Sequence, residues 1–306
     1  ILRYTLYNKS DLSYVASYRG DPEPLFFLLN LLAAKLGGFQ WVYIFEAFLS
    51  LYFVYLAFEK KIKEINLGIS VFIYATACYL FLFGLVRMSI AVGMVMYSYH
   101  YLEERRFGNY CAMILLATGF HYSAIIMLPM YFILENGIRK RGSRDAWIRG
   151  GVIFLFVIMF MFGAFLIVRL QGHFTWLRRY SGYFSGGMNW RVIFNILIMM
   201  PIILLAVLYG KNLKQAGKWN GYYMVMLLTI MAIVVASMTT GMIRLTYYFY
   251  PAGYYLYAHV YQMMSDRREK AIYLRILLIF CMCCFLYSFT SPLWKPYLIP
   301  YVLFVK

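Results

Sequence analysis

Apolar residues fall in repeated blocks of about 20 residues along the chain, and short clusters of Lys and Arg separate these blocks. A helix of about 20 residues crosses roughly 30 Å of hydrocarbon. Runs such as 152–168 are apolar at both odd and even positions, whereas a membrane-spanning strand alternates between the two. The pattern therefore predicts an all-α polytopic integral membrane protein.

The composition agrees with this prediction. Of the 306 residues, 63% are hydrophobic and only 13% are charged, which is about half the charged share of a typical soluble domain. The net charge of +17 would suggest nucleic acid as a partner of a soluble protein, but here it is better explained as topology information, and we expect no nucleic-acid partner. The five cysteines all lie in apolar blocks without acidic or His company, which favours packing over a metal site.

The basic clusters predict the topology. Candidate cytoplasmic loops are 60–63, 105–106, 139–149, 211–218 and 267–270. If all of them lie inside, the apolar blocks pair into hairpins. The predicted crossings are 39–58, 66–84, 85–102, 147–168, 192–208, 222–239, 243–263 and 271–290. This scheme places residues 1–24 and the loop 171–191 on the external face.

Two blocks need a separate explanation. Block 110–134 has the length of one crossing, yet basic loops flank both of its ends. Two half-length helices that meet near 119–121 would resolve this, with the unwound backbone buried in protein or lining a cavity. A single tilted span with one misassigned loop is the alternative. Block 25–36 is too short to cross and is expected in the outer interface, which gives about ten membrane segments in all.

The chain is expected to form one transmembrane domain, 1–306, because no linker long or polar enough to divide it is present. It opens on a polar stretch without a basic and then apolar signal region, so we expect a preceding N-terminal helix to be missing.

Arginine is in excess on the predicted outer side. The scheme leaves 12 Lys or Arg there against four acids, which opposes the positive-inside tendency. Arg87 and Arg244 sit just inside helix ends, where an ionised group costs roughly 2.5 kcal/mol or more at the bilayer centre. The forked guanidinium suits phosphate oxygens, which predicts an outward cavity for a phosphorylated ligand. The alternative is that Arg87 or Arg244 pairs with Glu46.

Aromatic and basic residues gather in two further places. Aromatic rings beside arginines bind sugars by stacking and phosphates by charge, although the same residues also form ordinary interfacial belts. In the external loop 171–191 the candidate ligand-binding residues are Arg178, Arg179, Tyr180 and Arg191. After Arg244, the residues predicted to line the same cavity wall are Tyr247 and Tyr248.

His121 and Glu23 are the candidates for proton transfer. The topology places His121 at the outer tip of block 110–134, near the depth of Arg87 and Arg244, where it can act as a general base or bond a phosphate. A buried histidine bonded to a carbonyl is the alternative. Glu23 lies between two prolines that hold the segment extended or turned, so its carboxylate can point into the cavity mouth.

Two stretches, Arg87-Met-Ser-Ile-Ala and Phe120-His-Tyr-Ser-Ala, form a fairly specific pair at this separation. Weaker signals are Arg244-Leu-Thr-Tyr-Tyr-Phe, Glu23-Pro24 before Leu28-Leu-Asn, and Ile299-Pro-Tyr near the end. Together these stretches resemble the EpsG family of Wzy-like polysaccharide polymerases. The resemblance runs over nearly the whole chain, but the external loop 171–191 matches poorly.

The resemblance implies a multi-pass protein of the bacterial inner membrane, with its active site facing outward. It would polymerise exopolysaccharide, capsule or O-antigen repeat units carried on undecaprenyl diphosphate, in contact with membrane lipids and with a chain-length regulator as a partner. It also implies a glycosyltransferase-C-like helical bundle with no metal and no cofactor. Diphosphate is a good leaving group, so the protein must neutralise its charge and position an acceptor hydroxyl.

Each candidate residue then has a role. We assign Arg87 and Arg244 to the diphosphate, and His121 or Glu23 to the acceptor hydroxyl. The loop arginines Arg178, Arg179 and Arg191 are assigned to a second lipid diphosphate or to sugar.

Two other functions remain open. An O-antigen ligase would use the same donor, but such enzymes usually carry a large folded external loop, and 171–191 is short. A flippase or other transporter of lipid-linked oligosaccharide would also need an outward cationic cavity. Transporters tend to have matched pairs of interrupted helices, and the sequence predicts only one interruption.

Overall fold

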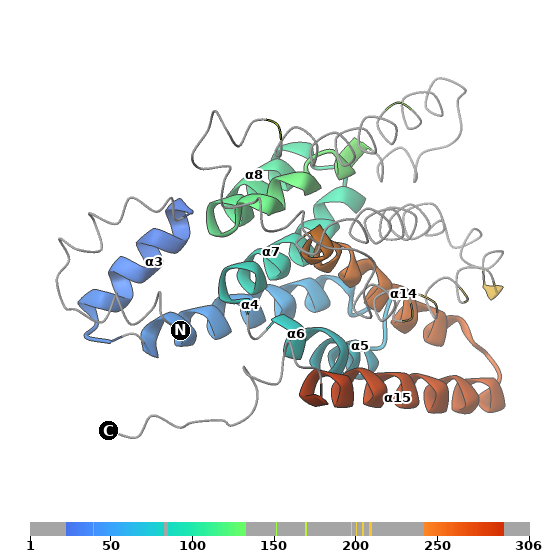
Figure 1. Ribbon diagram of the computed structural model, residues 1–306. Helices are drawn as coiled ribbons and strands as arrows, with labels where there is room; N and C mark the ends of the chain where they lie inside the picture. Colours follow the sequence, from blue (N-terminus) through green and yellow to red (C-terminus); the bar gives the residue numbers. More distant parts are fainter. Residues whose placement is uncertain are drawn as a thin grey trace.

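The computed structural model describes residues 23–38, 40–82, 85–132 and 242–290. It also describes seven separate positions, namely Gly151, Arg169, Leu197, Met200, Leu204, Leu208 and Tyr209. Every element in these ranges is a helix (Figure 1). The elements are α3 (Pro24–Lys35), α4 (Gln40–Lys61), α5 (Leu67–Tyr74), η2 (Ala75–Tyr79), α6 (Leu80–Leu82), α7 (Val86–Glu103), α8 (Phe107–Phe120), η3 (Tyr122–Met127), η5 (Met242–Tyr248), α14 (Tyr250–Met263) and α15 (Arg267–Thr290).

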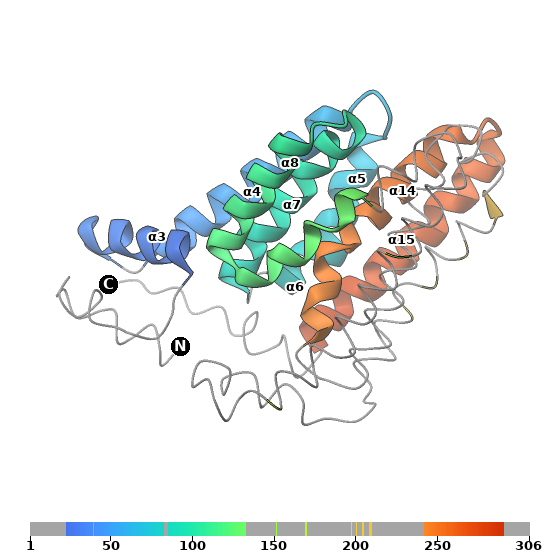
Figure 2. The same ribbon diagram turned by 90° about the horizontal axis from the view of Figure 1, so that it is seen from above.

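Helix α7 forms the centre of the described part. It packs between α4 and α8, and the three helices lie side by side (Figure 2). Most residues of α7 are buried, including the polar Ser89, Ser98 and His100. Carbonyls one turn earlier in the same helix satisfy these polar groups, since the Ser98 hydroxyl donates to the Val95 carbonyl at 2.7 Å.

Helices α4 and α7 run in the same direction with a matched register. Ser89 contacts Glu46 near one end, and Lys61 forms ion pairs with Glu103 and Glu64 at the other. The basic segments 60–63 and 105–106 therefore lie at one end of the bundle, as the topology predicted. Which face of the membrane this end meets stays a prediction.

Gly93 sets how closely α4 and α7 approach. A Cβ atom at Gly93 would lie 2.8 Å from the Ser50 carbonyl oxygen, closer than real Cβ atoms come to backbone. Small residues permit this kind of close helix packing in membranes.

We expect Gly93→Ala to lower the free energy of unfolding by about 1–3 kcal/mol, measured by thermal unfolding in detergent. Gly108→Ala is the matched control because no heavy atom lies within 4 Å of its Cβ position; an equal effect of both changes would contradict the packing role.

A second group of helices covers the other side of the core. Helix α14 packs on α5, and α15 lies against η2 and α6 (Figure 1). Buried tyrosine hydroxyls join these helices, since Tyr254 donates to the Ala77 carbonyl at 3.3 Å and Tyr273 to the Tyr257 carbonyl at 2.8 Å.

Block 110–134 is broken, as one of the two sequence interpretations predicted. Helix α8 ends at Phe120, His121 is extended with φ −151° and ψ 113°, and the 3-10 helix η3 begins at Tyr122. The alternative of a single tilted helix is wrong. Gly119 and the extended His121 end the α-helix here, and the His121 carbonyl accepts the Ala124 amide at 2.9 Å to start the 3-10 turn.

The expectation of only one interruption is also wrong. Block 243–263 begins with the 3-10 helix η5 and becomes α-helical only at Tyr250. Pro251 lies in the first turn of α14, and it has no amide hydrogen with which a continuous helix could bond back to residue 247. Block 66–84 carries a third irregularity, because η2 is a short π-helix between α5 and α6.

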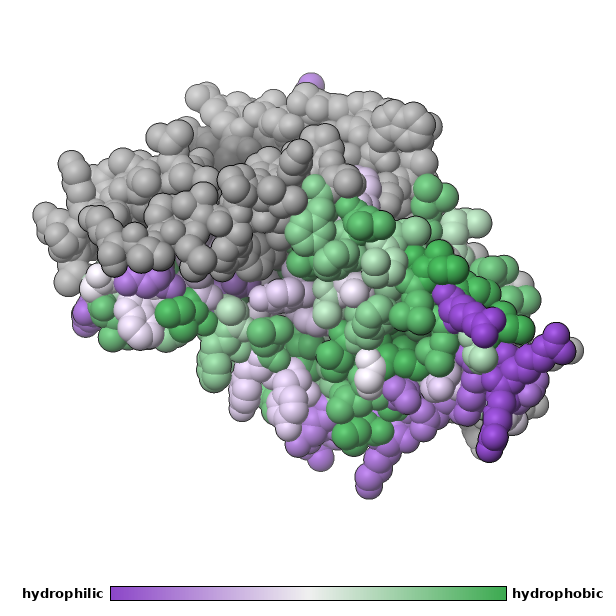
Figure 3. Space-filling model, turned by 90° about the horizontal axis from the view of Figure 1, so that it is seen from below, coloured by the Kyte–Doolittle hydropathy of each residue, from purple (hydrophilic) through white to green (hydrophobic). Residues whose placement is uncertain are grey.

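Two described helices are long and apolar enough to cross a membrane, namely Gln40–Lys61 and Arg267–Phe289. The exposed face of α15 is apolar at Ile272, Ile276, Ile279 and Leu286. Figure 3 shows apolar residues spread over the middle of the face seen from below, with the most hydrophilic residues toward the lower right and others at its edges. This distribution fits a membrane protein. The full set of about ten segments and the glycosyltransferase-C-like architecture stay predictions.

Candidate active site

Three residues predicted from separate blocks form one hydrogen-bonded cluster. The Glu23 carboxylate accepts from Arg87 Nη1 through Oε2 at 2.6 Å and contacts His121 Nδ1 through Oε1 at 2.8 Å. We call Glu23, Arg87 and His121 the ERH cluster. The structure thus brings His121 and Arg87, which were predicted at a similar depth, onto the same carboxylate of Glu23.

Helix ends place each member of the cluster. Glu23 precedes Pro24, which starts α3, and the Glu23 carbonyl accepts the Phe27 amide at 2.8 Å. Arg87 lies in the first turn of α7, and His121 occupies the break after α8. Proline suits a helix start because its fixed φ is already helical, so the Glu-Pro pair fixes where the carboxylate stands.

Burial and charge divide the cluster into an anchor and two accessible groups. The Glu23 side chain is 4% exposed, whereas those of Arg87 and His121 are 40% and 25% exposed. Burial alone would raise the pKa of Glu23, but the His121 hydrogen bond and the Arg87 charge outweigh it and lower that pKa to about 2. Glu23 is therefore ionised at neutral pH.

The ionised carboxylate fixes the state of the imidazole. A carboxylate only accepts hydrogen bonds, so Nδ1 of His121 carries the hydrogen and donates it. In the neutral ring, Nε2 then holds the free lone pair and can accept a proton. This arrangement has the base and the orienting carboxylate of a catalytic dyad.

The Glu23 ion pair predicts a pH effect on stability. Because the pKa of Glu23 falls from 4.5 unfolded to about 2 folded, its contribution is complete above pH 4.5 and is lost as pH falls toward 2. In the His121→Asn background, where no imidazole titrates at this position, the loss of melting temperature caused by Glu23→Gln should be constant from pH 8 to 5 and shrink below 4.5. A difference that grows on acidification would contradict the ionised state.

Arg87 does not pair with Glu46, so that alternative is wrong for Arg87; for Arg244, whose side chain lies outside the described part, it stays a prediction. Its guanidinium lies beside Glu23, with Cζ 5.6 Å from the centre of the Phe26 ring. Glu46 lies further along the bundle, where it contacts the Ser89 hydroxyl. The larger part of α7 separates Arg87 from the ion pairs of Lys61 at the opposite end.

The contact between Gly119 and Leu25 holds α3 against α8. A Cβ at Gly119 would lie 2.7 Å from Leu25 Cγ, and Leu25 is two residues from Glu23 just as Gly119 is two residues from His121. We expect Gly119→Ala to shift α3 by tenths of an ångström and lower turnover about tenfold, because catalysis depends steeply on position. The melting temperature should change little. Turnover equal to that of Gly108→Ala, measured in liposomes, would show that α3 tolerates the methyl group.

Tyr247 and Tyr248 are both buried, and Tyr248 reaches η3 close to His121. Tyr248 is 0% exposed, and its hydroxyl lies 3.0 Å from Ser123 Oγ. The Tyr248 carbonyl accepts the Tyr99 hydroxyl at 2.8 Å. The predicted exposed cavity wall is thus a packed layer at these two positions, because both rings turn into the core.

Several predicted residues lie outside the described part of the structure. They are Arg178, Arg179, Tyr180 and Arg191, together with the rest of the loop 171–191. For Arg244 only the backbone is described, as part of η5. Their predicted roles stay predictions. Sequence reasoning gave no role to Ser123 or Tyr99, although Ser123 stands inside the quoted Phe-His-Tyr-Ser stretch and so could have been found.

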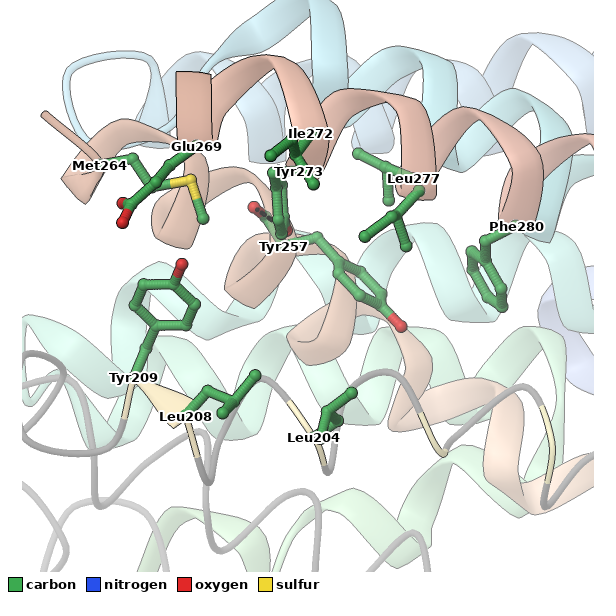
Figure 4. Close-up of a pocket in the computed structure, with 11 residues that line it drawn as sticks. Leu204, Leu208, Tyr209, Tyr257, Met264, Glu269, Ile272, Tyr273, Leu277 and Phe280 are labelled. Carbon is green, nitrogen blue, oxygen red and sulfur yellow. Dashed lines mark hydrogen bonds between the residues drawn. The ribbon is translucent and has the colours of Figure 1, made fainter. Parts of the chain in front are cut away.

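A cavity of about 290 Å³ lies elsewhere, between α14, α15 and the separately described Leu204, Leu208 and Tyr209 (Figure 4). Leucine, isoleucine and aromatic side chains line most of it. Glu269 is the one charged residue among its described lining, so the cavity presents no cation to a phosphate there. It does not compete with the ERH cluster as a site for phosphorylated substrate.

Comparison with known families shows to which family the chain belongs. A match to the EpsG family covers residues 3–303, nearly the whole chain. The chain belongs to the EpsG family. No curated protein and no solved structure matches it. Membership in this family, together with the apolar helices, makes the chain a membrane protein associated with polysaccharide biosynthesis.

Proposed function

We propose that this EpsG-family protein is a glycosyltransferase that polymerises oligosaccharide repeat units carried on undecaprenyl diphosphate. The ERH cluster supports the proposal most strongly, because it places a cation for diphosphate and a base for a hydroxyl on one carboxylate. A transferase with a lipid-diphosphate donor needs both groups at one place.

The cluster suggests a division of labour during transfer. The acceptor hydroxyl attacks the anomeric carbon of the donor sugar, and its proton passes to Nε2 of His121. The new glycosidic C–O bond forms as the C–O bond to the diphosphate breaks. Arg87 then balances the negative charge that develops on the departing lipid diphosphate. Arg244 is the second proposed diphosphate ligand, and the loop arginines and Tyr180 contact sugar or a second lipid diphosphate.

Glu23 is better suited to orienting His121 than to accepting the proton. A carboxylate with a pKa of about 2 is a weak base at neutral pH. Glu23 also holds both of its oxygens in contacts with Arg87 and His121, and its side chain is almost fully buried. Of the two residues predicted for the acceptor hydroxyl, we therefore assign the proton transfer to His121.

The place of action follows from topology and family. We place the protein in the bacterial inner membrane with the ERH cluster facing outward. The cluster lies at the end of α4 and α7 opposite the basic segments 60–63 and 105–106, which favour the cytoplasmic side. A chain-length regulator is the expected protein partner.

Transport of the lipid-linked oligosaccharide is the second candidate, and one observation favours it. Two interrupted helices meet, because η3 contacts η5 through Ser123 and Tyr248. Broken helices that meet at a substrate site are common in transporters. A carboxylate-oriented imidazole, in contrast, has a direct use in transfer chemistry.

Reconstitution in liposomes distinguishes the two functions. Lipid-diphosphate-linked repeat units are supplied without nucleotide sugar, and the products are separated on a gel. The proposal predicts a ladder spaced by one repeat unit. Protection of the lipid-linked sugar from an external modifying enzyme, without a ladder, would instead support transport.

A further inference from the structure

Tyr248 joins the two helix breaks at one point. Its side-chain hydroxyl lies 3.0 Å from Ser123 Oγ on η3, and its carbonyl accepts the Tyr99 hydroxyl of α7 at 2.8 Å. Tyr248 is the last residue of η5 and is 0% exposed. A hydrogen bond of a fully buried hydroxyl holds its two partners in place strongly, because moving them apart would leave an unsatisfied polar group in the core.

The elements that Tyr248 connects carry the proposed catalytic groups. Ser123 follows His121 by two residues, and the His121 carbonyl starts the turn that holds Ser123 in place. Arg244 lies four residues before Tyr248 in η5, about 8 Å along a 3-10 helix. The third partner, Tyr99, stands on α7, the helix that carries Arg87.

We infer that Tyr248 is a positioning residue that sets the His121 break against the Arg244 helix and thereby aligns the acceptor hydroxyl with the donor diphosphate. The inference rests on the proposed function. It replaces the predicted direct contact of Tyr248 with substrate, since a side chain with no exposed surface reaches substrate only through the residues it holds. The hydroxyl of Tyr248 carries this positioning role, because a phenylalanine ring would fill the same space without the hydrogen bond to Ser123.

Misalignment has a consequence that differs from simple instability. In productive transfer the acceptor oxygen replaces the diphosphate oxygen on the sugar, and each lipid diphosphate released matches one glycosidic bond formed. When the acceptor is held out of line, water takes its place, so lipid diphosphate is released without a new bond. The ratio of lipid diphosphate released to bonds formed is independent of how much protein is folded.

Two variants remove the same hydrogen bond from opposite sides, Tyr248→Phe and Ser123→Ala. In liposomes with lipid-linked repeat units we expect the ratio to stay near one for the wild type and to rise several-fold in both variants. The double variant should match the single ones, because only one bond is lost. Tyr254→Phe is the matched control, since this buried tyrosine bonds Ala77 and touches neither break.

The outcomes separate the inference from the proposed function. A ratio near one in both Tyr248→Phe and Ser123→Ala, with activity lost only in proportion to folded protein, would overturn the positioning role. An equal rise in Tyr254→Phe would overturn it too, since any buried tyrosine would then have the same effect. If the wild type forms no glycosidic bonds from the lipid-linked donor, the proposed function itself fails and this inference with it.

Discussion

Arg87→Ala is expected to abolish polymer synthesis, with a loss of about 10²–10³-fold or more in turnover of lipid-linked repeat units. The guanidinium is 40% exposed although its partner Glu23 is almost fully buried, so Arg87 has surface available for a second anion. Removing it takes away the positive charge that the leaving diphosphate requires. Chain length on a gel, normalised to folded protein, measures the effect.

Arg87→Ala alone does not separate a catalytic effect from a stability effect, because it also removes the cation that pairs with Glu23. An uncompensated buried carboxylate costs about 3–5 kcal/mol and could reduce activity by unfolding alone. The double variant Arg87→Ala with Glu23→Gln removes that charge, while the glutamine oxygen can still accept from His121 Nδ1. We expect the double variant to regain folded protein but not polymer. Near-normal polymer in it would show that Arg87 serves only to neutralise Glu23.

Replacement of His121 is expected to have the second large effect. His121→Asn keeps an amide near the Nδ1 position that bonds Glu23, and His121→Gln places an amide near Nε2. Neither amide accepts a proton at neutral pH, so both variants should lose about 10²–10⁴-fold in transfer rate. His121→Leu loses the side-chain hydrogen bond to Glu23, so it should lower the melting temperature more than either amide variant does.

The rate as a function of pH provides the control for His121. If His121 is the base, the acid limb of the wild-type profile should disappear in His121→Asn, because no group at this position titrates. An unchanged acid limb, or substantial transfer by either amide variant, would reduce His121 to a structural residue.

The positions of the helix breaks show how far sequence could predict the fold. The break at His121 was one of two interpretations of its block, because two basic loops cannot flank one crossing if both are inside. The break before Tyr250 was missed, although Pro251 signalled it, because the block had the length of an ordinary span. The sequence predicted α7 as one membrane span like the others, whereas in the structure it is the buried central helix. Its burial depends on which helices pack around it, and hydrophobic periodicity does not reveal this.

The site was partly predictable for similar reasons. The cost of a charge in a membrane singled out Arg87, and the topology placed His121 near it. Glu23 links the two because α3 packs on α8, and the sequence pattern does not reveal that packing. The same holds for Tyr248, whose place after Arg244 suggested a cavity wall but whose ring is buried against Ser123.

One measurement tests the central claim most directly. Purified wild-type protein, Glu23→Gln and the double variant Arg87→Ala with Glu23→Gln are placed in liposomes with lipid-diphosphate-linked repeat units and a metal chelator. The account predicts a ladder from the wild type, a weaker ladder from Glu23→Gln and none from the double variant. A wild-type ladder that needs added metal, or one that persists at full length in the double variant, would contradict the assignment of the diphosphate to Arg87.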